Sequence, residues 1–342
     1  MISIFVLAML AGAFAYSMKV ETKLARNANS ESELEWLGRS AVECARWELA
    51  QYLSQSPPLL YDSLEQPWAG GSSIVGISNS PLMDFKHEIE NKNGSATWTI
   101  IDLERKANIN TANEAVLQQA LMAMGVDAGQ MTPVVNCVLD WIDPDDNSRV
   151  QGAESEFYQS LPKPYNAKNG PIDDLSELLL IKGAADFYAG VPPEVSGPAP
   201  FNPHASRFGA AAATMPSLAV GLTNMFTALS GGRINVNTAS AEVLQIIPGV
   251  TPEIAQGIVS ARNGEDDGSG LMGPYRTLND LRRVPEVPLP MLAVMSQFCD
   301  VRSQTFEVHV DARVGDYHRH FTAIIGRRPP RDIQILSFYW TD

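Results

Sequence analysis

The N-terminal apolar run places the strongest constraint on what this chain can become. Residues Ile2 to Met18 read ISIFVLAMLAGAFAYSM and include no charged side chain. As a helix the run is ~26 Å long, slightly shorter than the ~30 Å hydrocarbon core of a bilayer. It predicts a membrane-embedded helix over residues 1–18, with Lys19 at the interface. A cleaved signal peptide is the competing interpretation, but the run shows no basic segment before it and no clear small-residue cleavage site after it.

The helical pattern continues beyond the apolar run over residues 19–56. Apolar side chains recur there at three- and four-residue steps, which places them in one stripe on a polar helix. The first break is Ser56-Pro57-Pro58, so anchor and stripe are expected to form one continuous helix. We expect the stripe to pack on a folded body and to provide the interface with partner helices; it consists of Leu34, Leu37, Ala41, Ala45, Leu49 and Leu53.

Composition limits the partners and the crosslinks. The 342 residues can form two or more cores, and the formal net charge of -14 argues against a partner that presents bare phosphates, so no nucleic acid is expected. Three cysteines do not make a disulfide framework. Free, buried thiols are favoured over a single pair.

Strand signals lie on both sides of a long central region. Residues 87–90 and 96–103 flank Asn93-Gly94, a strong hairpin signal. After the central region, residues 305–313, 317–326 and 333–339 carry matching strand signals. Two strands before the centre and three after it predict one antiparallel sheet with a large insertion, and so an α+β fold.

The central region reads as helical and includes a diverged repeat. NINTA at residues 108–112 recurs as NVNTA at residues 235–239, with Thr111 and Thr238 as expected helix N-caps. The expected division is 57–106 for the first part of the sheet domain, 107–301 for the insertion and 302–342 for the last strands; within the insertion, 107–190 is the first module, 191–232 a variable linker and 233–301 the second module.

The second repeat continues as a helix, a turn and another helix. Pro248-Gly249-Val250 reads as the turn and Thr251 as the next N-cap, an arrangement that resembles a helix-hairpin-helix. Thr277 and Asp280 form a further expected capping box. DNA-binding hairpins carry Gly-x-Gly in the turn, but Thr251 occupies the second glycine position here. Compact packing modules are therefore favoured over nucleic-acid binding.

An acidic stretch, DWIDPDDNSRVQGAESEFY at residues 140–158, lies between the repeats. Counted from Asp143, its oxygen-bearing residues have the spacing of an EF-type calcium loop, except that Ser148 replaces the usual glycine. A calcium loop of another geometry is favoured, and a solvated acidic loop is the alternative. The expected ligands are Asp143, Asp145, Asn147 and Glu154, with Asp140, Asp146 and Glu156 as auxiliary candidates.

Together these features resemble a known family. The apolar helix, the two Asn-x-Asn-Thr-Ala modules, the Asp-Trp-Ile-Asp-Pro-Asp-Asp stretch and PYNAKNGPIDDLSELLLIKG at residues 164–183 are similar to the general secretion pathway protein K family. Its members are the large minor pseudopilins of bacterial type II secretion. The similarity follows nearly the whole chain and is weakest over residues 191–215. Counted from Met1, Phe5 stands where ordinary pilins carry Glu, as in tip members of the family.

The resemblance implies a pilin-like fold whose inserted all-α domain holds two helix-hairpin-helix-like (SAM-like) modules and calcium. It further implies assembly with two other minor pseudopilins, above the major pseudopilin, at the tip of a type II secretion pseudopilus. The chain would cross the inner membrane of a Gram-negative bacterium once, through residues 2–18, with a periplasmic body. It would initiate or cap pseudopilus assembly and aid protein export across the outer membrane.

Catalysis is not expected. The five histidines are scattered, and neither a nucleophile motif nor a phosphate-cradling glycine-rich loop is present in the sequence. The alternative function is a membrane-anchored DNA-binding or DNA-uptake protein that uses its hairpin modules. Salt-dependent binding to duplex DNA would distinguish it from the pseudopilin.

Overall fold

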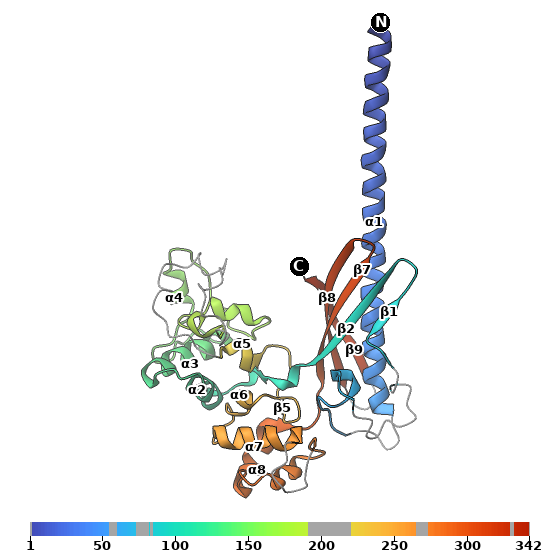
Figure 1. Cartoon of the computed structure of the whole chain (residues 1–342). Coiled ribbons are helices and arrows are strands. Elements are labelled where there is room, and N and C mark those ends of the chain that lie inside the picture. Colours follow the sequence, from blue (N-terminus) through green and yellow to red (C-terminus); the bar gives the residue numbers. More distant parts are fainter. Residues whose placement is uncertain are drawn as a thin grey trace, which may run out of the picture. The chain divides into compact units, whose positions relative to one another are not determined.

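The computed structural model describes residues 2–54, 60–72, 82, 85–190, 220–264, 273–328 and 332–341. The chain divides into two compact units (Figure 1). Unit 1 consists of Met1–Leu59, Gln66–Ile101 and Phe306–Asp342, and unit 2 of Leu60–Glu65 and Asp102–Thr305. Unit 2 thus begins and ends a few residues outside the expected insertion of 107–301, and it includes a short segment before the sheet.

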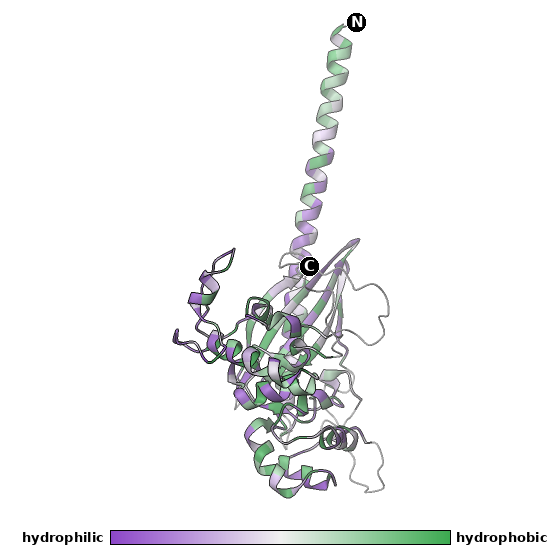
Figure 2. Cartoon of the chain, turned by 90° about the vertical axis from the view of Figure 1, so that its left-hand side faces the viewer, coloured by the Kyte–Doolittle hydropathy of each residue, from purple (hydrophilic) through white to green (hydrophobic). Residues whose placement is uncertain are grey.

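Helix α1 spans Ile2–Ser54 without a break. It includes a window of 18 residues with a mean hydropathy of 1.7, none of which is buried, and this makes α1 long and apolar enough to cross a membrane. Figure 2 shows the change along the helix from a hydrophobic N-terminal half to a largely hydrophilic second half.

Five strands form the sheet of unit 1 in the order β1-β2-β7-β8-β9. The hairpin between the first two strands lies at the predicted Asn93-Gly94, where the Asn91 side chain accepts hydrogen bonds from both backbone N–H groups at 2.8 Å. The two strands before the insertion and three after it confirm the predicted split sheet. The strands are β1 (Glu88–Glu90), β2 (Gly94–Asp102), β7 (Thr305–Val314), β8 (Tyr317–Arg328) and β9 (Asp332–Thr341).

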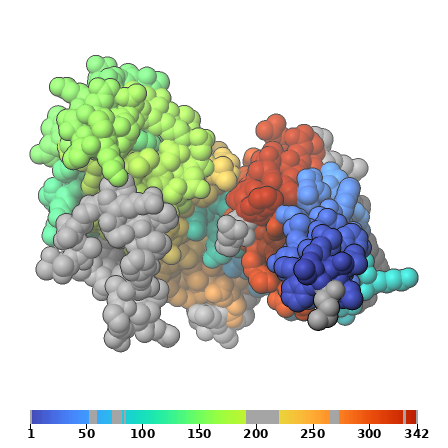
Figure 3. Space-filling model, turned by 90° about the horizontal axis from the view of Figure 1, so that it is seen from above, coloured from blue at the N-terminus to red at the C-terminus, as the bar shows by residue number. Residues whose placement is uncertain are grey.

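The second half of α1 packs on this sheet. Gly38 lies against Phe321 of β8, so closely that a Cβ on Gly38 would come within 2.7 Å of the ring. The view along the helix shows α1 beside the C-terminal strands (Figure 3). The stripe residues Leu34, Leu37, Ala41, Ala45 and Leu49 are all buried in the core of unit 1.

The burial of the stripe corrects the role predicted for it. Its five members with described burial contact the chain's own sheet, so they are not exposed to a partner helix. The side chain of Leu53 lies outside the described residues. The sequence showed that the stripe needs an apolar surface, and the sheet of unit 1 provides it.

Two contacts define which end of the sheet is nearer the apolar run. Asn93, in the β1–β2 turn, donates to Glu33 at 3.1 Å, and Tyr317, at the start of β8, contacts Asn27 at 2.5 Å. Both turns therefore lie at the end of the sheet nearer the anchor. Strand β2 leads away from this end and β7 returns toward it, so the insertion leaves the sheet at the end far from the anchor.

Unit 2 is built from short helices and two parallel ladders of two residues each, β3 with β4 and β5 with β6. The ladders add a small strand content to an insertion that was expected to be all-α. In chain order the elements are η2 (Leu103–Arg105), β3 (Ala107–Asn108), η3 (Ile109–Thr111), α2 (Glu114–Ala123), α3 (Ala128–Ile142), α4 (Ser155–Gln159), η4 (Leu175–Leu179), η5 (Ala185–Phe187), α5 (Leu222–Met225), β4 (Phe226–Thr227), β5 (Ile234–Asn235), α6 (Ala241–Leu244), α7 (Pro252–Asn263), η7 (Leu278–Arg283), α8 (Leu289–Phe298) and β6 (Cys299–Asp300).

The repeat predicted from the sequence has the same geometry in both copies. Asn110 bonds through both atoms of its amide to the backbone of Ile172, at 2.7 and 2.9 Å. Asn237 does the same with Tyr275, at 2.8 and 2.9 Å. Each second asparagine therefore ties its module to a distant segment, which is a structural role.

The N-caps predicted in the two repeats were wrong. The side chain of Asn113 caps α2, and that of Ser240 caps α6. The reason is that the first asparagine of each repeat accepts a bond from the N–H two residues later and forms a tight turn, which delays the helix. The N-cap at Thr251 and the capping box of Thr277 with Asp280 are confirmed.

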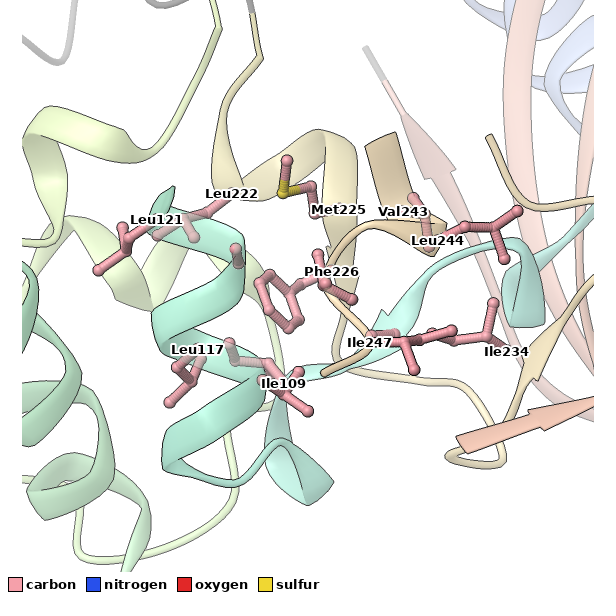
Figure 4. Close-up of a cluster of buried hydrophobic side chains, with 14 of the residues drawn as sticks. Ile109, Leu117, Leu121, Leu222, Met225, Phe226, Ile234, Val243, Leu244 and Ile247 are labelled. Carbon is pink, nitrogen blue, oxygen red and sulfur yellow. The ribbon is translucent and has the colours of Figure 1, made fainter. Parts of the chain in front are cut away.

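One core joins the two modules (Figure 4). Ile109 and Leu121 of the first module lie in the same cluster as Ile234 and Leu244 of the second. Residues 191–219 of the expected linker lie outside the described residues. Residues 220–232 are not a linker, because Leu222, Met225 and Phe226 are buried in this core.

Candidate metal centre

The acidic loop connects two helices of unit 2. Helix α3 ends at Ile142, and α4 begins at Ser155 with Glu154 as its N-cap residue. The side chain of Glu154 makes no capping bond, so its carboxylate is available to the loop. Gln151 has a φ of 64°, so the left-handed residue of the loop is not the one at the glycine position of an EF-hand. This agrees with a loop of another geometry.

Three of the predicted ligands come together. Asp143, Asp145 and Glu154 each place a carboxylate oxygen within 4.8 Å of the others. Such a cluster of hard oxygen ligands suits calcium, whose ligand oxygens lie at about 2.3–2.6 Å. The helix–loop–helix connection brings Glu154 back to the start of the loop, which sequence spacing alone suggested.

Glu154 is the member whose surroundings point most directly to a cation. It is 4% exposed, and neither of its carboxylate oxygens has a hydrogen-bond partner among the described residues. Burial, followed by the charges of Asp140 and Asp143, raises the pKa of Glu154 to about 7. A buried carboxylate without a donor is costly unless a positive charge accompanies it, so the cluster fits a bound cation.

The auxiliary candidates have different surroundings. Asp140 is buried on α3 and accepts from the Ala153 N–H at 2.9 Å. Asp146 accepts from the Ser155 N–H at 3.2 Å, and the hydrogen bonds from Ser155 lower its pKa. Glu156 is exposed. None of these auxiliary candidates belongs to the cluster of Asp143, Asp145 and Glu154, which we call the three-acid cluster.

Two asparagines hold the loop. The backbone N–H of Asn147 donates to the Asp145 carboxylate at 2.9 Å, which closes a local turn. Asn169, outside the predicted loop, donates from its side chain to the Asp145 carbonyl at 2.8 Å. Its Oδ1 atom is buried without a partner. Sequence spacing missed Asn169 because it lies 24 residues from Asp145; its only signal was its place in the resembling PYNAKNG segment.

The turn of the second hairpin module is covered. Gly249 has a φ of 86°, and a Cβ on it would lie 3.0 Å from the methyl group of Met291 on α8. The next N–H, of Val250, donates to the Ile247 carbonyl at 3.0 Å. Met291 therefore packs against this turn, and the N–H of Val250 is already used within it.

The chain matches two family models. Residues 97–195 match the model described as type II secretion system (T2SS), protein K, and residues 230–298 match the helix-hairpin-helix motif. The first match includes most of β2, the first repeat and the whole acidic loop. The second covers the hairpin of α6 and α7 and continues through α8.

Three curated relatives carry the same family name. The type II secretion system protein K of Pectobacterium carotovorum is 27% identical over 30% of this chain and 36% of its own length. A putative protein K of Escherichia coli K12 is 37% identical over 21% of this chain and 22% of its own length. The protein K of Pseudomonas aeruginosa PAO1 is 25% identical over 60% of this chain and 51% of its own length. The chain thus matches about half or less of the length of these relatives.

A solved structure extends the similarity of fold to almost the whole chain. A chain from the crystal structure of the GspK-GspI-GspJ complex of enterotoxigenic Escherichia coli superposes with a TM-score of 0.64. The alignment covers 93% of this chain and 99% of that chain, at 17% identity. It confirms the pilin-like fold with a helical insertion. The family model and the named relatives show that residues 97–195 of this chain are similar to type II secretion system protein K, and the solved structure shows that nearly the whole chain shares its fold.

Proposed function

We propose that this chain is a minor pseudopilin at the tip of a type II secretion pseudopilus, where it initiates or caps assembly and aids protein export across the outer membrane. The observation that supports this most strongly is the exit of the insertion at the sheet end far from the anchor, between β2 and β7. Both connections to an insertion of about 200 residues leave the sheet at that end, which suits a subunit above which no other subunit is stacked. The role is structural and includes no catalysis.

The proposed partners follow from the solved relative. That structure is a complex of GspK with GspI and GspJ, so we assign two smaller minor pseudopilins to this chain, with the major pseudopilin below. Since the apolar stripe of α1 packs on the chain's own sheet, the partner helices would contact the opposite, exposed side. Trp36 is 71% exposed on α1. The apolar half of α1 would anchor the chain in the inner membrane of a Gram-negative bacterium, with both units in the periplasm.

Calcium is the proposed ion of the acidic loop, and its role is structural. It would bring Asp143, Asp145 and Glu154 together and so hold the connection between α3 and α4. Asp145 is exposed and Glu154 is buried, so the ion would join the surface of the loop to its base. Calcium supplies the positive charge that Glu154 lacks among the described residues.

The tip position is tested by where the chain lies on isolated pseudopili. An antibody against an epitope inserted after Asp127 would be expected at one end of each filament. Labelling along the filament length would contradict the tip role.

Coexpression with the two smaller minor pseudopilins tests the partners. The wild type should copurify with both, and Trp36→Glu should weaken that copurification, whereas the control Trp47→Glu, on a residue that packs 5.1 Å from Phe85, tests unit 1 packing.

The alternative of DNA binding predicts a different result. A protein that reads phosphates binds duplex DNA with an affinity that falls as salt rises. We expect the full chain to bind no duplex DNA at low salt, because its net charge is -14 and the turn at Gly249 is covered. Salt-dependent binding, lost on substitution of the exposed Arg282, would favour the alternative.

A further inference from the structure

One ion pair beside the metal cluster has no role in the proposed ligand set. Asp140, on α3, is fully buried, and its Oδ1 lies 2.7 Å from Nη1 of Arg149. Asp140 also accepts from the backbone N–H of Arg149 at 3.2 Å and from that of Ala153 at 2.9 Å. A buried aspartate on a rigid helix thus fixes the middle of the loop and one arginine side chain.

The same guanidinium reaches a predicted ligand. Nη1 of Arg149 contacts Oδ2 of Asp143 as well as Asp140. The other oxygen of Asp143, Oδ1, is buried and has no hydrogen-bond partner. Arg149 therefore holds Asp143 by one oxygen and leaves the second free for the cluster with Glu154.

The loop closes over Asp140 with little space. A Cβ on Gly152 would lie 1.9 Å from Oδ2 of Asp140, so only glycine fits at this position. The adjacent Gln151 has a φ of 64°, and the following N–H, of Ala153, bonds to the same carboxylate. The backbone that leads into Glu154 is therefore shaped around Asp140.

We infer that Asp140 and Arg149 are a positioning pair for the metal centre: Asp140 orients Arg149, and Arg149 presents one oxygen of Asp143 to the ion. This inference depends on the proposed calcium site. Groups that orient metal ligands through hydrogen bonds commonly change metal affinity about 10–100-fold when removed. Asp140 is then not a metal ligand. Its buried carboxylate holds the loop backbone and the Arg149 side chain in place.

The opposite role for Arg149 makes the opposite prediction. If its guanidinium were a tethered competitor of the ion, its removal would free Asp143 and tighten calcium binding. If it positions Asp143, its removal weakens binding, even though one positive charge has left the neighbourhood of the cation. The sign of the change in affinity therefore distinguishes the two roles.

The test is calorimetric titration of the full chain in detergent with calcium. We expect Arg149→Gln to raise the Kd about 10–100-fold. Arg149→Lys should fall between wild type and Arg149→Gln, because Lys keeps the charge but lacks the planar guanidinium whose Nη1 contacts both carboxylates. The control is Arg283→Gln, which removes the same charge from an exposed arginine paired with Asp280 in unit 2 and should leave the Kd unchanged.

A second variant keeps the test independent of Arg149 itself. Gly152→Ala should displace Asp140 and weaken calcium binding in the same direction. Thermal unfolding in chelator shows whether each variant is folded before calcium is added. Unchanged or tighter binding in Arg149→Gln would overturn the positioning role. A wild type that binds no calcium would instead refute the proposed site, so the two failures are distinguishable.

Discussion

Glu154 is the side chain whose charge should matter most to the acidic loop. Its carboxylate is buried and has no hydrogen-bond donor. We expect Glu154→Gln to weaken calcium binding at least ~10-fold. In chelator above pH 7, where the buried carboxylate is ionised, the substitution should raise the melting temperature, because it removes an uncompensated charge. The control is Glu156→Gln, the same change at an exposed neighbour. A lower melting temperature of Glu154→Gln in chelator would contradict the account.

The raised pKa of Glu154 gives the site a pH dependence. In the metal-free folded protein Glu154 stays protonated up to about pH 7, because burial raises its pKa from 4.5 to about 7. Between these two values the folded state binds more protons than the unfolded state, so metal-free stability falls as pH rises through this window. Calcium requires the ionised form, so its affinity should rise with pH up to about 7 and then level off. Titrations with calcium on both sides of this pKa test this; Glu154→Gln should remove most of the dependence.

At the scale of single residues, sequence spacing predicted which acidic side chains lie together, but not what surrounds them. The positions of Asp143, Asp145 and Glu154 follow an ion-binding spacing, and the structure clusters them. The same spacing made Asp140 an auxiliary ligand candidate and did not reveal its contacts with the loop. Its role depends on burial and on the approach of Arg149 and Gly152, which are properties of the folded loop. Asn169 was missed for the same reason.

The contact between α1 and the sheet depends on one small residue. A Cβ on Gly38 would lie 2.7 Å from the ring of Phe321, closer than side-chain atoms approach. We expect Gly38→Val to destabilise unit 1 by ~1–3 kcal/mol through overpacking. Gly12→Val is the matched control, since a Cβ at Gly12 would meet nothing within 4 Å. Hydrogen exchange of β8 measures the effect, and equal protection in both variants would contradict it.

Among the elements, strands and helices were predictable where a local rule determines them. The strand signals and the Asn93-Gly94 turn predicted the sheet, and the helical pattern without a break before Ser56-Pro57 predicted α1. The helix starts after Thr111 and Thr238 were not predictable, because the asparagines before them form turns that compete with capping. Burial of Leu222, Met225 and Phe226 depends on the joint core of the two modules, which no local pattern reveals.

At the scale of the molecule, the topology carries more functional information than any single side chain. A pilin-like sheet is interrupted between β2 and β7, two strands that are neighbours in the sheet and distant in sequence. The order of the sequence motifs predicted this interruption. It did not predict which end of the sheet carries the insertion, because that depends on the contacts of Asn93 and Tyr317 with α1.

The two units should respond differently to calcium. Unit 1 and unit 2 have separate hydrophobic cores, and the three-acid cluster lies within unit 2. An ion that binds only the folded form stabilises the unit that holds it, by ~2.7 kcal/mol at a concentration 100 times the Kd. Scanning calorimetry of the full chain in detergent should therefore show one transition that falls on chelation and one that does not.

A substitution in unit 1 assigns these transitions. Leu49 is fully buried in the core of unit 1, and Leu49→Ala should cost ~2–5 kcal/mol. We expect it to lower the transition that chelation leaves unchanged. A single transition that moves with both perturbations would mean that the units unfold together. Calcium would then stabilise the sheet as well as the insertion, since loss of the ion would lower the stability of the entire folded chain.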